Sequence, residues 1–244
     1  MTISQSMNRG KIMGIPERKE REKEHRREEI INAAQKVFFE KGLQVATMDE
    51  IADAAELSKG TLYLYYKSKE DLYLAVMVRG MEILYEMFAK TVNTPEPTIP
   101  RLKNLADAYY EFFKQQRNYF RMFYFFQNPQ FHKQVSDEMM KTCNSENQKV
   151  WRVVIDLIQQ GMREGQIRSD INPVEIAVIL WAGANAIMMR MDTQLDYFKA
   201  ELGVDLESVL RKTNILLLES VMTEDAKKKH RSILQVDNKS EALN

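Results

Sequence analysis

Two helix starts that lie close together constrain the fold of this chain more than any other sequence feature. Thr47 and Glu50 form a capping box, in which the threonine hydroxyl and the glutamate carboxylate bind free amides at a helix start. Ser58 can cap a second helix a few residues later, so both helices are confined to short stretches. Helices this short are marginal alone and need a neighbour to pack against. The pattern is typical of a helix-turn-helix, whose second helix presents its N-terminal residues to base edges in the major groove.

The second of these helices has a composition that suits DNA. Three lysines and no acidic residue occur between Leu57 and Lys69, and the tyrosines among them can donate to phosphate oxygens. Gly60 has no side chain to keep a DNA backbone away. The whole chain has 35 basic and 35 acidic residues, so attraction to nucleic acid has to come from local charge of this kind. A solvated surface with structural tyrosines is the alternative interpretation.

Apolar residues at helical spacing flank the two short helices on both sides. One stripe runs from Ile30 to Gly42, where the glycine caps the end of the helix. A second capping box, Ser68 with Asp71, opens a long helix to about Val92. Three prolines between residues 95 and 100 break the pattern, so the first 92 residues or so form a unit.

Nearly every residue from Glu17 to Glu29 is charged, with alternating signs. This pattern favours a solvated helix extension held by ion pairs one turn apart. A basic arm that touches phosphates through Arg18, Arg21, Arg26 or Arg27 is the alternative, although the neighbouring acids weaken it. Residues 1–16 are polar and aperiodic, and we expect them to be poorly ordered.

The stretch from Thr47 to Leu72 closely resembles the DNA-binding signature of TetR-family regulators, and the likeness extends back over the helix from Ile30 to Gly42. One residue departs from it: Glu56 occupies the turn position where the family commonly has glycine. A non-glycine residue in a left-handed turn costs on the order of 1 kcal/mol. The resemblance implies an all-α chain, with an N-terminal three-helix helix-turn-helix domain and a larger C-terminal helical domain for ligand binding and dimerisation.

The resemblance also implies roles for individual residues. Thr47 would contact a phosphate, Lys59 to Thr61 would face DNA at the start of the recognition helix, and Lys69 would hold a phosphate from the next helix. Leu62 is expected to pack inward, and the place of Leu64 is left open. The predicted DNA-binding residues are Thr47, Ser58, Lys59, Gly60, Thr61, Tyr63, Tyr65, Lys67 and Lys69.

Four segments are predicted along the chain. They are an arm over residues 1–22, a helix-turn-helix domain over 23–72, a ligand-binding and dimerisation domain over 73–222, and a charged, mobile tail over 223–244. In the third segment, helices are expected over about 101–116, 118–127, 131–164, 173–192 and 205–222.

The last two of these helices are apolar over more than one face. A helix of that kind needs burial on both sides, and a twin across a two-fold axis would supply it as a four-helix interface. A homodimer also matches a palindromic site, because one recognition helix covers one half-site. The predicted interface residues are Trp181, Ala184, Met188, Leu210 and Leu217.

An effector pocket is implied by the family resemblance, and an aromatic-rich stretch from Tyr109 to Phe126 is the best place for it. Apolar walls with a few convergent polar groups are what small ligands need. The alternative is that these aromatic residues simply form the hydrophobic core. The predicted ligand-binding residues are Tyr109, Phe113, Arg117, Phe123, Tyr124, Gln127, Trp151, Asn185 and Met189.

Other kinds of site are disfavoured by the sequence. The single cysteine, Cys143, excludes an internal disulfide and fits a reducing cytoplasm, and the three histidines lack metal-ligand spacing. There is no nucleophile elbow, P-loop or dinucleotide fingerprint, so we expect neither enzymatic activity nor a cofactor. No run approaches the roughly 18 apolar residues that span a bilayer, so no membrane partner is expected.

The sequence therefore predicts a cytoplasmic, ligand-responsive transcriptional regulator. We expect a repressor that binds a palindromic operator as a homodimer and is released by a hydrophobic or aromatic small molecule. An activator, or a DNA-binding protein that depends on a co-repressor, is the alternative. A helical protein–protein adaptor would not need the lysine-only recognition segment.

Overall fold

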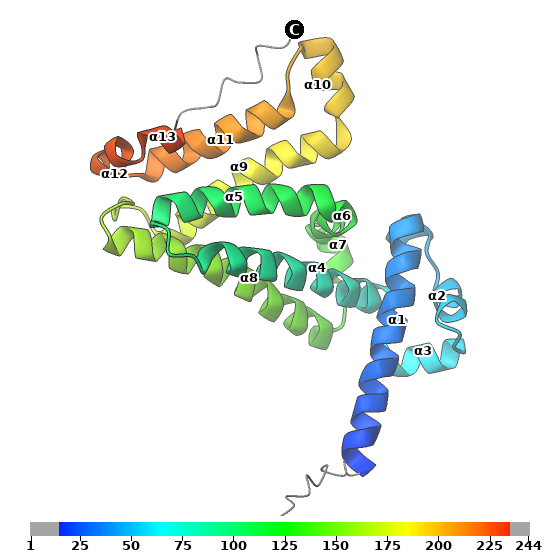
Figure 1. Ribbon diagram of the computed structural model, residues 1–244. Coiled ribbons are helices and arrows are strands. Elements are labelled where there is room, and N and C mark those ends of the chain that lie inside the picture. Colours follow the sequence, from blue (N-terminus) through cyan, green and yellow to red (C-terminus); the bar gives the residue numbers. More distant parts are fainter. Residues whose placement is uncertain (1–14, 235–244) are drawn as a thin grey trace, which may run out of the picture. The chain divides into compact units, whose positions relative to one another are not determined.

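The computed structural model describes residues 15–234, and its regular elements there are helices (Figure 1). The one other regular contact within that range is an isolated antiparallel bridge between Ile167 and Met222. The all-α class expected from the sequence is confirmed. The predicted disorder of residues 1–16 falls almost wholly outside the described residues, as does the last part of the predicted tail.

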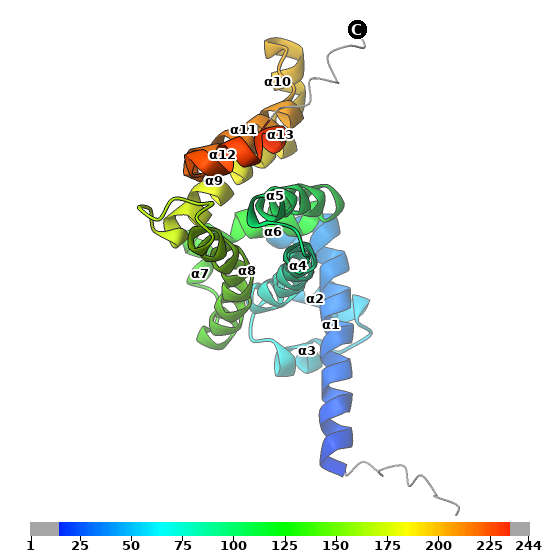
Figure 2. The same ribbon diagram turned by 60° about the vertical axis from the view of Figure 1, so that its left-hand side comes forward.

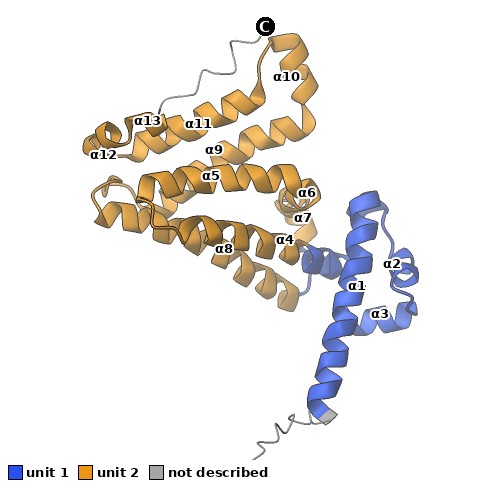
Figure 3. Cartoon of the chain, in the orientation of Figure 1, with its two compact units in different colours: residues 1–76, 133–136 blue, residues 77–132, 137–244 orange. Residues whose placement is uncertain are grey.

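The chain divides into two compact units (Figure 3). The first contains the described part of residues 1–76 together with 133–136, and the second contains 77–132 together with the described part of 137–244. Helix α4 (Lys69–Val92) begins in the first unit and continues in the second as one uninterrupted helix.

The described part of the first unit is built from three helices and the start of α4. These are α1 (Ile15–Val45), α2 (Met48–Ala54) and α3 (Lys59–Tyr65). Its core contains Ile30, Ile51, Leu62 and Leu72, each with no exposed surface. Both short helices therefore obtain by burial the stability that their length cannot give them.

Helix α1 is longer than the apolar stripe predicted. The charged segment after Glu17 is helical and carries ion pairs one turn apart, such as Arg18 with Glu22 at 3.0 Å and Arg26 with Glu29 at 2.8 Å. At the other end Gly42 has a positive φ of 73°, and the helix resumes to Val45 after this break. The glycine interrupts the helix as expected, but it does not end it.

The turn between α2 and α3 contains the left-handed residue that the sequence predicted. Glu56 has a φ of 55°, and it is the one non-glycine residue with positive φ among those described. The amide of Leu57 donates to the carbonyl of Ala52 at 2.9 Å and closes the turn. The turn therefore keeps its geometry without glycine, at a cost on the order of 1 kcal/mol.

Within its described residues, the second unit consists of the rest of α4 and nine further helices (Figures 1 and 2). They are α5 (Thr98–Gln115), α6 (Arg117–Phe126), α7 (Pro129–His132), α8 (Asp137–Arg163), α9 (Pro173–Thr193), α10 (Leu195–Leu202), α11 (Leu206–Val221), α12 (Glu224–Lys229) and α13 (Arg231–Leu234).

Three sequence expectations for this unit are wrong. The single helix expected over residues 131–164 is two helices, α7 and α8, separated by residues 133–136, which belong to the first unit. Helix α10 was not expected at all. The tail expected from Thr223 forms α12 and α13, because the Thr223 hydroxyl accepts the amide of Ala226 at 3.3 Å and donates to the carbonyl of Gly165 at 2.8 Å.

A polar network around the buried side chains of Thr98 and Arg101 joins the end of α4, the start of α5 and the end of α8. The Arg101 guanidinium donates to the carbonyl of Val92 at 3.1 Å, and the hydroxyl of Thr98 donates to the Glu164 carboxylate at 2.7 Å. The hydrogen bond from Thr98 is the main cause that lowers the pKa of Glu164. The network satisfies a carbonyl at the C-terminus of α4 that the helix itself leaves without a donor.

Helices α9 and α11 pack closely against each other, and Gly183 allows it. A Cβ atom at Gly183 would overlap the side chain of Leu217 on α11. The side chains of Met188 and Leu210 are buried, with 0% and 2% of their surface exposed. Much of the apolar character of both helices is therefore used within the protomer.

Helix α9 is long and apolar enough to cross a membrane, by length and composition alone. Its most apolar 18-residue window has a mean hydropathy of 1.4, and 28% of that window is buried. The sequence prediction concerned unbroken apolar runs, and polar residues such as Glu175, Asn185 and Arg190 interrupt this helix. Core helices of soluble proteins can have the same composition, so the question for α9 is what covers its exposed face.

Asp71 ties residues 133–136 to the start of α4. Asp71 has 4% of its surface exposed, and its carboxylate accepts the amide of Ser136 at 2.7 Å. We predict that Asp71→Ala lowers the free energy of unfolding by about 1–3 kcal/mol, because a partly buried amide loses its acceptor. Urea unfolding followed by circular dichroism measures the change. Glu70→Ala is the matched control in the same helical turn, and an equal loss in both variants would contradict the assignment.

Candidate DNA-binding surface and ligand cavity

The recognition helix α3 buries one residue and exposes most of the others. Leu62 has no exposed surface, as expected, whereas Tyr63 and Leu64 are 46% and 84% exposed. Ser58 caps the helix by accepting the amide of Thr61 at 3.1 Å. Leu64, which the sequence left open, therefore offers an apolar surface of the kind that contacts thymine methyl groups.

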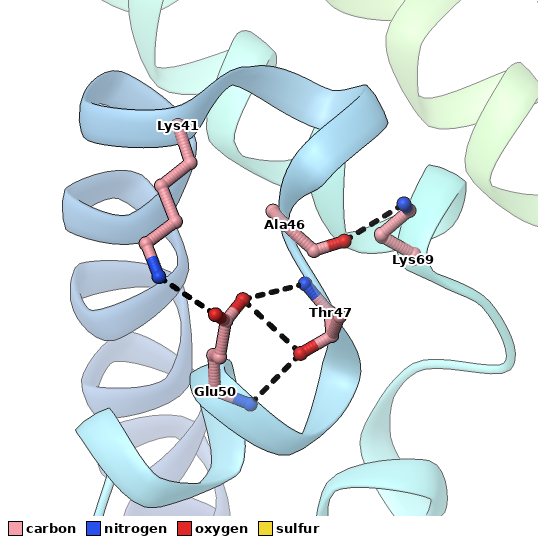
Figure 4. A network of polar contacts seen from close by, with 5 residues as sticks. All are labelled: Lys41, Ala46, Thr47, Glu50 and Lys69. Carbon is pink, nitrogen blue, oxygen red and sulfur yellow. Dashed lines mark hydrogen bonds and ion pairs between the residues drawn. The ribbon is translucent and has the colours of Figure 1, made fainter.

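The capping box at the start of α2 is formed as predicted (Figure 4). The Thr47 hydroxyl accepts the amide of Glu50 at 3.2 Å, and the Glu50 carboxylate accepts the amide of Thr47 at 3.0 Å. Lys41 of α1 adds a hydrogen bond to the same carboxylate at 2.6 Å, which is the main cause that lowers the pKa of Glu50. The Thr47 hydroxyl is exposed, but its proton has to turn away from Glu50 before it can reach a phosphate.

Two of the predicted lysine contacts already have partners within the protein. Lys69 donates to the carbonyl of Ala46 at 2.8 Å, which fixes the link between α1 and α2 to the start of α4 (Figure 4). Lys59 pairs with Asp49 at 2.8 Å, and this hydrogen bond is the main cause that raises the pKa of Lys59. These partners could not be found from sequence spacing, because they lie on different helices.

The remaining predicted DNA contacts lie around the start and end of α3. Lys59, Gly60 and Lys67 are exposed, and Thr61 and Tyr65 are partly exposed. The whole predicted set belongs to the first unit. Its members therefore share one compact body, and their contacts with DNA stay predictions.

The second unit encloses a cavity of about 600 Å³. Residues from α4, α5, α6, α8, α9, α11 and α13 line it, and most of them are apolar or aromatic. Among the polar wall residues, the Tyr109 hydroxyl donates to the Asn185 side-chain oxygen at 3.3 Å, and burial raises the pKa of this phenol. The two tryptophans of the chain, Trp151 and Trp181, both line the cavity and meet edge to face at 5.7 Å.

Five of the nine predicted ligand residues lie on this wall: Tyr109, Phe123, Gln127, Trp151 and Asn185.

The other four predicted ligand residues do not line the cavity. Phe113 is 1% exposed and packs against Phe120 with ring centroids 4.9 Å apart. Arg117 pairs with Asp192 at 2.9 Å, and Tyr124 is 53% exposed. Met189 is partly exposed elsewhere on α9. The ligand role of these four stays a prediction that the cavity does not support, because periodicity cannot tell which side of a helix faces the cavity.

The C-terminal helices contribute to the cavity wall, which the charge pattern of the sequence did not predict. Arg211, Asn214 and Leu218 of α11 line it, and so do Ile233 and Leu234 of α13. Residues 223–244 had been assigned to a tail by their charge alone. The signal that could have revealed this wall is the apolar pair at positions 233 and 234 within that charged stretch.

Most of the predicted interface residues point into the protomer. Trp181 and Ala184 line the cavity, and Leu217 packs against Gly183. Met188 and Leu210 are buried, so neither they nor Ala184 can contact a partner. Trp181 keeps 36% of its surface exposed, and α9 and α11 also expose Val174, Val178, Ile179 and Leu216.

Side chains that could hold a metal are dispersed over the described residues, which contain no group of three or more histidine, cysteine or acidic side chains at ligating distance. Cys143 is fully buried, and desolvation raises the pKa of its thiol to about 12. A thiol of this kind is a poor nucleophile at neutral pH.

Comparison with known proteins agrees with this arrangement. The family described as "Bacterial regulatory proteins, tetR family" matches residues 30–76. The HTH-type transcriptional repressor KstR2 of Mycolicibacterium smegmatis is 27% identical over 60% of this chain and 70% of its own length. The HTH-type transcriptional activator FasR of the same organism is 33% identical over 42% of this chain and 47% of its own length.

Solved structures show the same fold over most of the chain. FadR of Bacillus subtilis, in complex with stearoyl-CoA, superposes with a TM-score of 0.62 at 17% identity and covers 79% of this chain and 98% of FadR. FadR of Bacillus halodurans, a fatty acid degradation regulator, gives a TM-score of 0.61 at 18% identity over 80% of this chain and 98% of its own. With the helix-turn-helix of α2 and α3 in place, these likenesses show a TetR-family DNA-binding domain over residues 30–76 and the fold of the FadR regulators over most of the chain.

Proposed function

We propose that the protein is a ligand-responsive repressor that binds a palindromic operator as a homodimer and is released by a hydrophobic small molecule. The cavity in the second unit is the observation that carries this proposal. Its volume of about 600 Å³ lies within the range of small-molecule sites, and its wall combines aromatic residues with a few polar groups. The similarity to the repressor KstR2 supports the sign of regulation.

An acyl-CoA is the first ligand class to test. The FadR neighbour was solved with stearoyl-CoA, and a fatty acyl chain suits an apolar wall. Gln127, Asn147 and Asn214 give polar partners on the wall, and Arg211 and Lys103 add positive charge. An activator role is the second candidate, because FasR is an activator.

Helix α4 offers a physical route from the ligand to the DNA. Met81, Leu84 and Phe88 of this helix line the cavity, whereas Leu72 and Leu74, near its start, are buried in the DNA-binding unit. A ligand that binds one position of α4 better than another shifts the population of states by its difference in affinity. Release follows if the favoured state no longer presents two recognition helices to successive major grooves.

The homodimer would be formed through α9 and α11. Val174, Val178 and Ile179 of α9 are 48%, 44% and 45% exposed, and Leu216 of α11 is 65% exposed. Exposed apolar residues on two neighbouring helices are what a partner copy would cover. A twin copy explains the exposed apolar face of α9 without a membrane, in keeping with a cytoplasmic protein.

Selection from random duplex DNA is expected to recover a palindrome bound at nanomolar affinity. Tyr63→Ala should weaken binding to this palindrome about two- to tenfold, because one hydrogen bond to DNA is lost. The circular dichroism spectrum should not change. Fluorescence anisotropy at fixed salt measures the affinity, and Tyr85→Ala, an exposed tyrosine of α4, is the control. Unchanged affinity would remove Tyr63 from the contacts. Recovery of a sequence only when acyl-CoA is present would favour co-repression.

Ile179→Asp is expected to convert the dimer to monomers, because it places a charge in the centre of the apolar face. Sedimentation velocity at micromolar concentration reports the change in mass. Tyr124→Asp introduces the same charge at a 53% exposed site on α6 and should remain dimeric. A stable Ile179→Asp dimer would place the interface elsewhere.

Stearoyl-CoA is expected to alter the tryptophan emission, because both tryptophans line the cavity. Ala106→Phe adds a ring to the cavity wall and should weaken this binding about tenfold or more, whereas Ala200→Phe on the exposed side of α10 should not. Fluorescence titration measures both. Equal affinities in the two variants would place the ligand outside the cavity.

A further inference from the structure

The first turn of α2 carries two carboxylates, and each is bound to a lysine of another helix. Glu50 pairs with Lys41 of α1 and also accepts the amide of Thr47, so its carboxylate is part of the capping box. Asp49 pairs with Lys59 of α3, and both of its oxygens lie close to the ammonium, at 2.8 and 2.9 Å. The two acids therefore differ in purpose, because Glu50 supports the local fold and Asp49 engages only the lysine.

The Asp49–Lys59 pair is open to solvent. The side chains are 64% and 52% exposed, so the pair is of the weak surface kind. Lys59 is the first residue of the recognition helix. A DNA phosphate that reaches Lys59 presents the same chemistry as the carboxylate, since both are oxyanions. Carboxylate and phosphate therefore compete for one ammonium group.

We infer that Asp49 is an internal competitor of DNA phosphate, which holds Lys59 in the free protein and lowers the affinity of the protein for any duplex. The inference rests on the proposed contact of Lys59 with DNA. A phosphate contact carries no sequence information, so Asp49 weakens operator and random duplex by the same factor. Nonspecific binding is essentially electrostatic, so a competitor at this lysine reduces the time that the protein spends on nonspecific DNA.

If Asp49 instead positions Lys59 or α2, its removal should change the DNA affinity in the opposite direction. If Asp49 served to orient Lys59 towards DNA, or to hold α2 against α3, its loss would weaken binding or lower the melting temperature. A general charge effect also has to be separated, since removal of any acid near DNA raises affinity. Asp53 provides the matched control, because it is an exposed acid on the same helix and is not paired with Lys59.

The test compares Asp49→Asn with Asp53→Asn, each in the wild-type and in a Lys59→Met background. Affinities for the selected operator and for a random-sequence duplex of equal length are measured by fluorescence anisotropy at several salt concentrations. We expect Asp49→Asn to raise both affinities about two- to fivefold more than Asp53→Asn does. In the Lys59→Met background the two substitutions should become equal, because the competing ammonium is gone.

Three results would overturn the inference. The first is a gain in affinity from Asp49→Asn that is no larger than the gain from Asp53→Asn. The second is a larger gain from Asp49→Asn that persists in the Lys59→Met background. The third is a gain in affinity for the operator without one for the random duplex. Lys59→Met alone tests the proposed contact separately, because it should weaken binding to both duplexes. If Lys59→Met weakens binding but Asp49→Asn and Asp53→Asn raise the affinity equally, the DNA contact of Lys59 is supported and the competition by Asp49 is refuted.

Discussion

Helices α2 and α3 exist as helices because one face of each is buried against its neighbours. Ile51 and Leu62 have no exposed surface, although each helix has only seven residues. Seven residues cannot sustain a helix in water, so tertiary burial substitutes for length. The same arrangement leaves the opposite face of α3 free, with Leu64 84% exposed. Every property of the DNA-binding surface depends on this division between a buried and an exposed face.

Polar contacts around this core determine how the surface charges behave. Lys41, Lys59 and Lys69 come from three helices, and each donates to an oxygen of the same small unit. Lys41 and Lys69 thereby stabilise the ends of α1, α2 and α4, whereas Lys59 takes part in an exposed pair that costs little to break. A lysine near DNA is therefore not equivalent to a free positive charge.

The apolar helices of the second unit contribute both to the interior of the protomer and to its outer surface. Helices α9 and α11 bury Met188 and Leu210 inside the protomer, place Trp181 on the cavity wall, and still expose Val178 and Ile179. One pair of helices therefore serves core, cavity and outer surface through different faces. This sharing explains why α9 is apolar nearly all round and has the composition of a membrane helix.

Local chemistry in the sequence was sufficient for the helix-turn-helix. The capping box at Thr47 and the cap at Ser58 depend on residues within a few positions of one another. The left-handed residue at Glu56 and the burial of Leu62 were expected from the family resemblance. Interactions of that range are encoded by spacing, so the fold class and this motif could be predicted from the sequence.

Tertiary structure decided the rest, because the remaining features depend on which faces of distant helices meet. The partners of Lys59 and Lys69 lie 10 and 23 positions away along the chain. Phe113 and Met188 became core, and Ile233 and Leu234 became cavity wall, without any change in their local pattern. Apolar periodicity specifies that a residue is buried, but not whether it is buried by core, ligand or partner. That choice is made only when the helices pack.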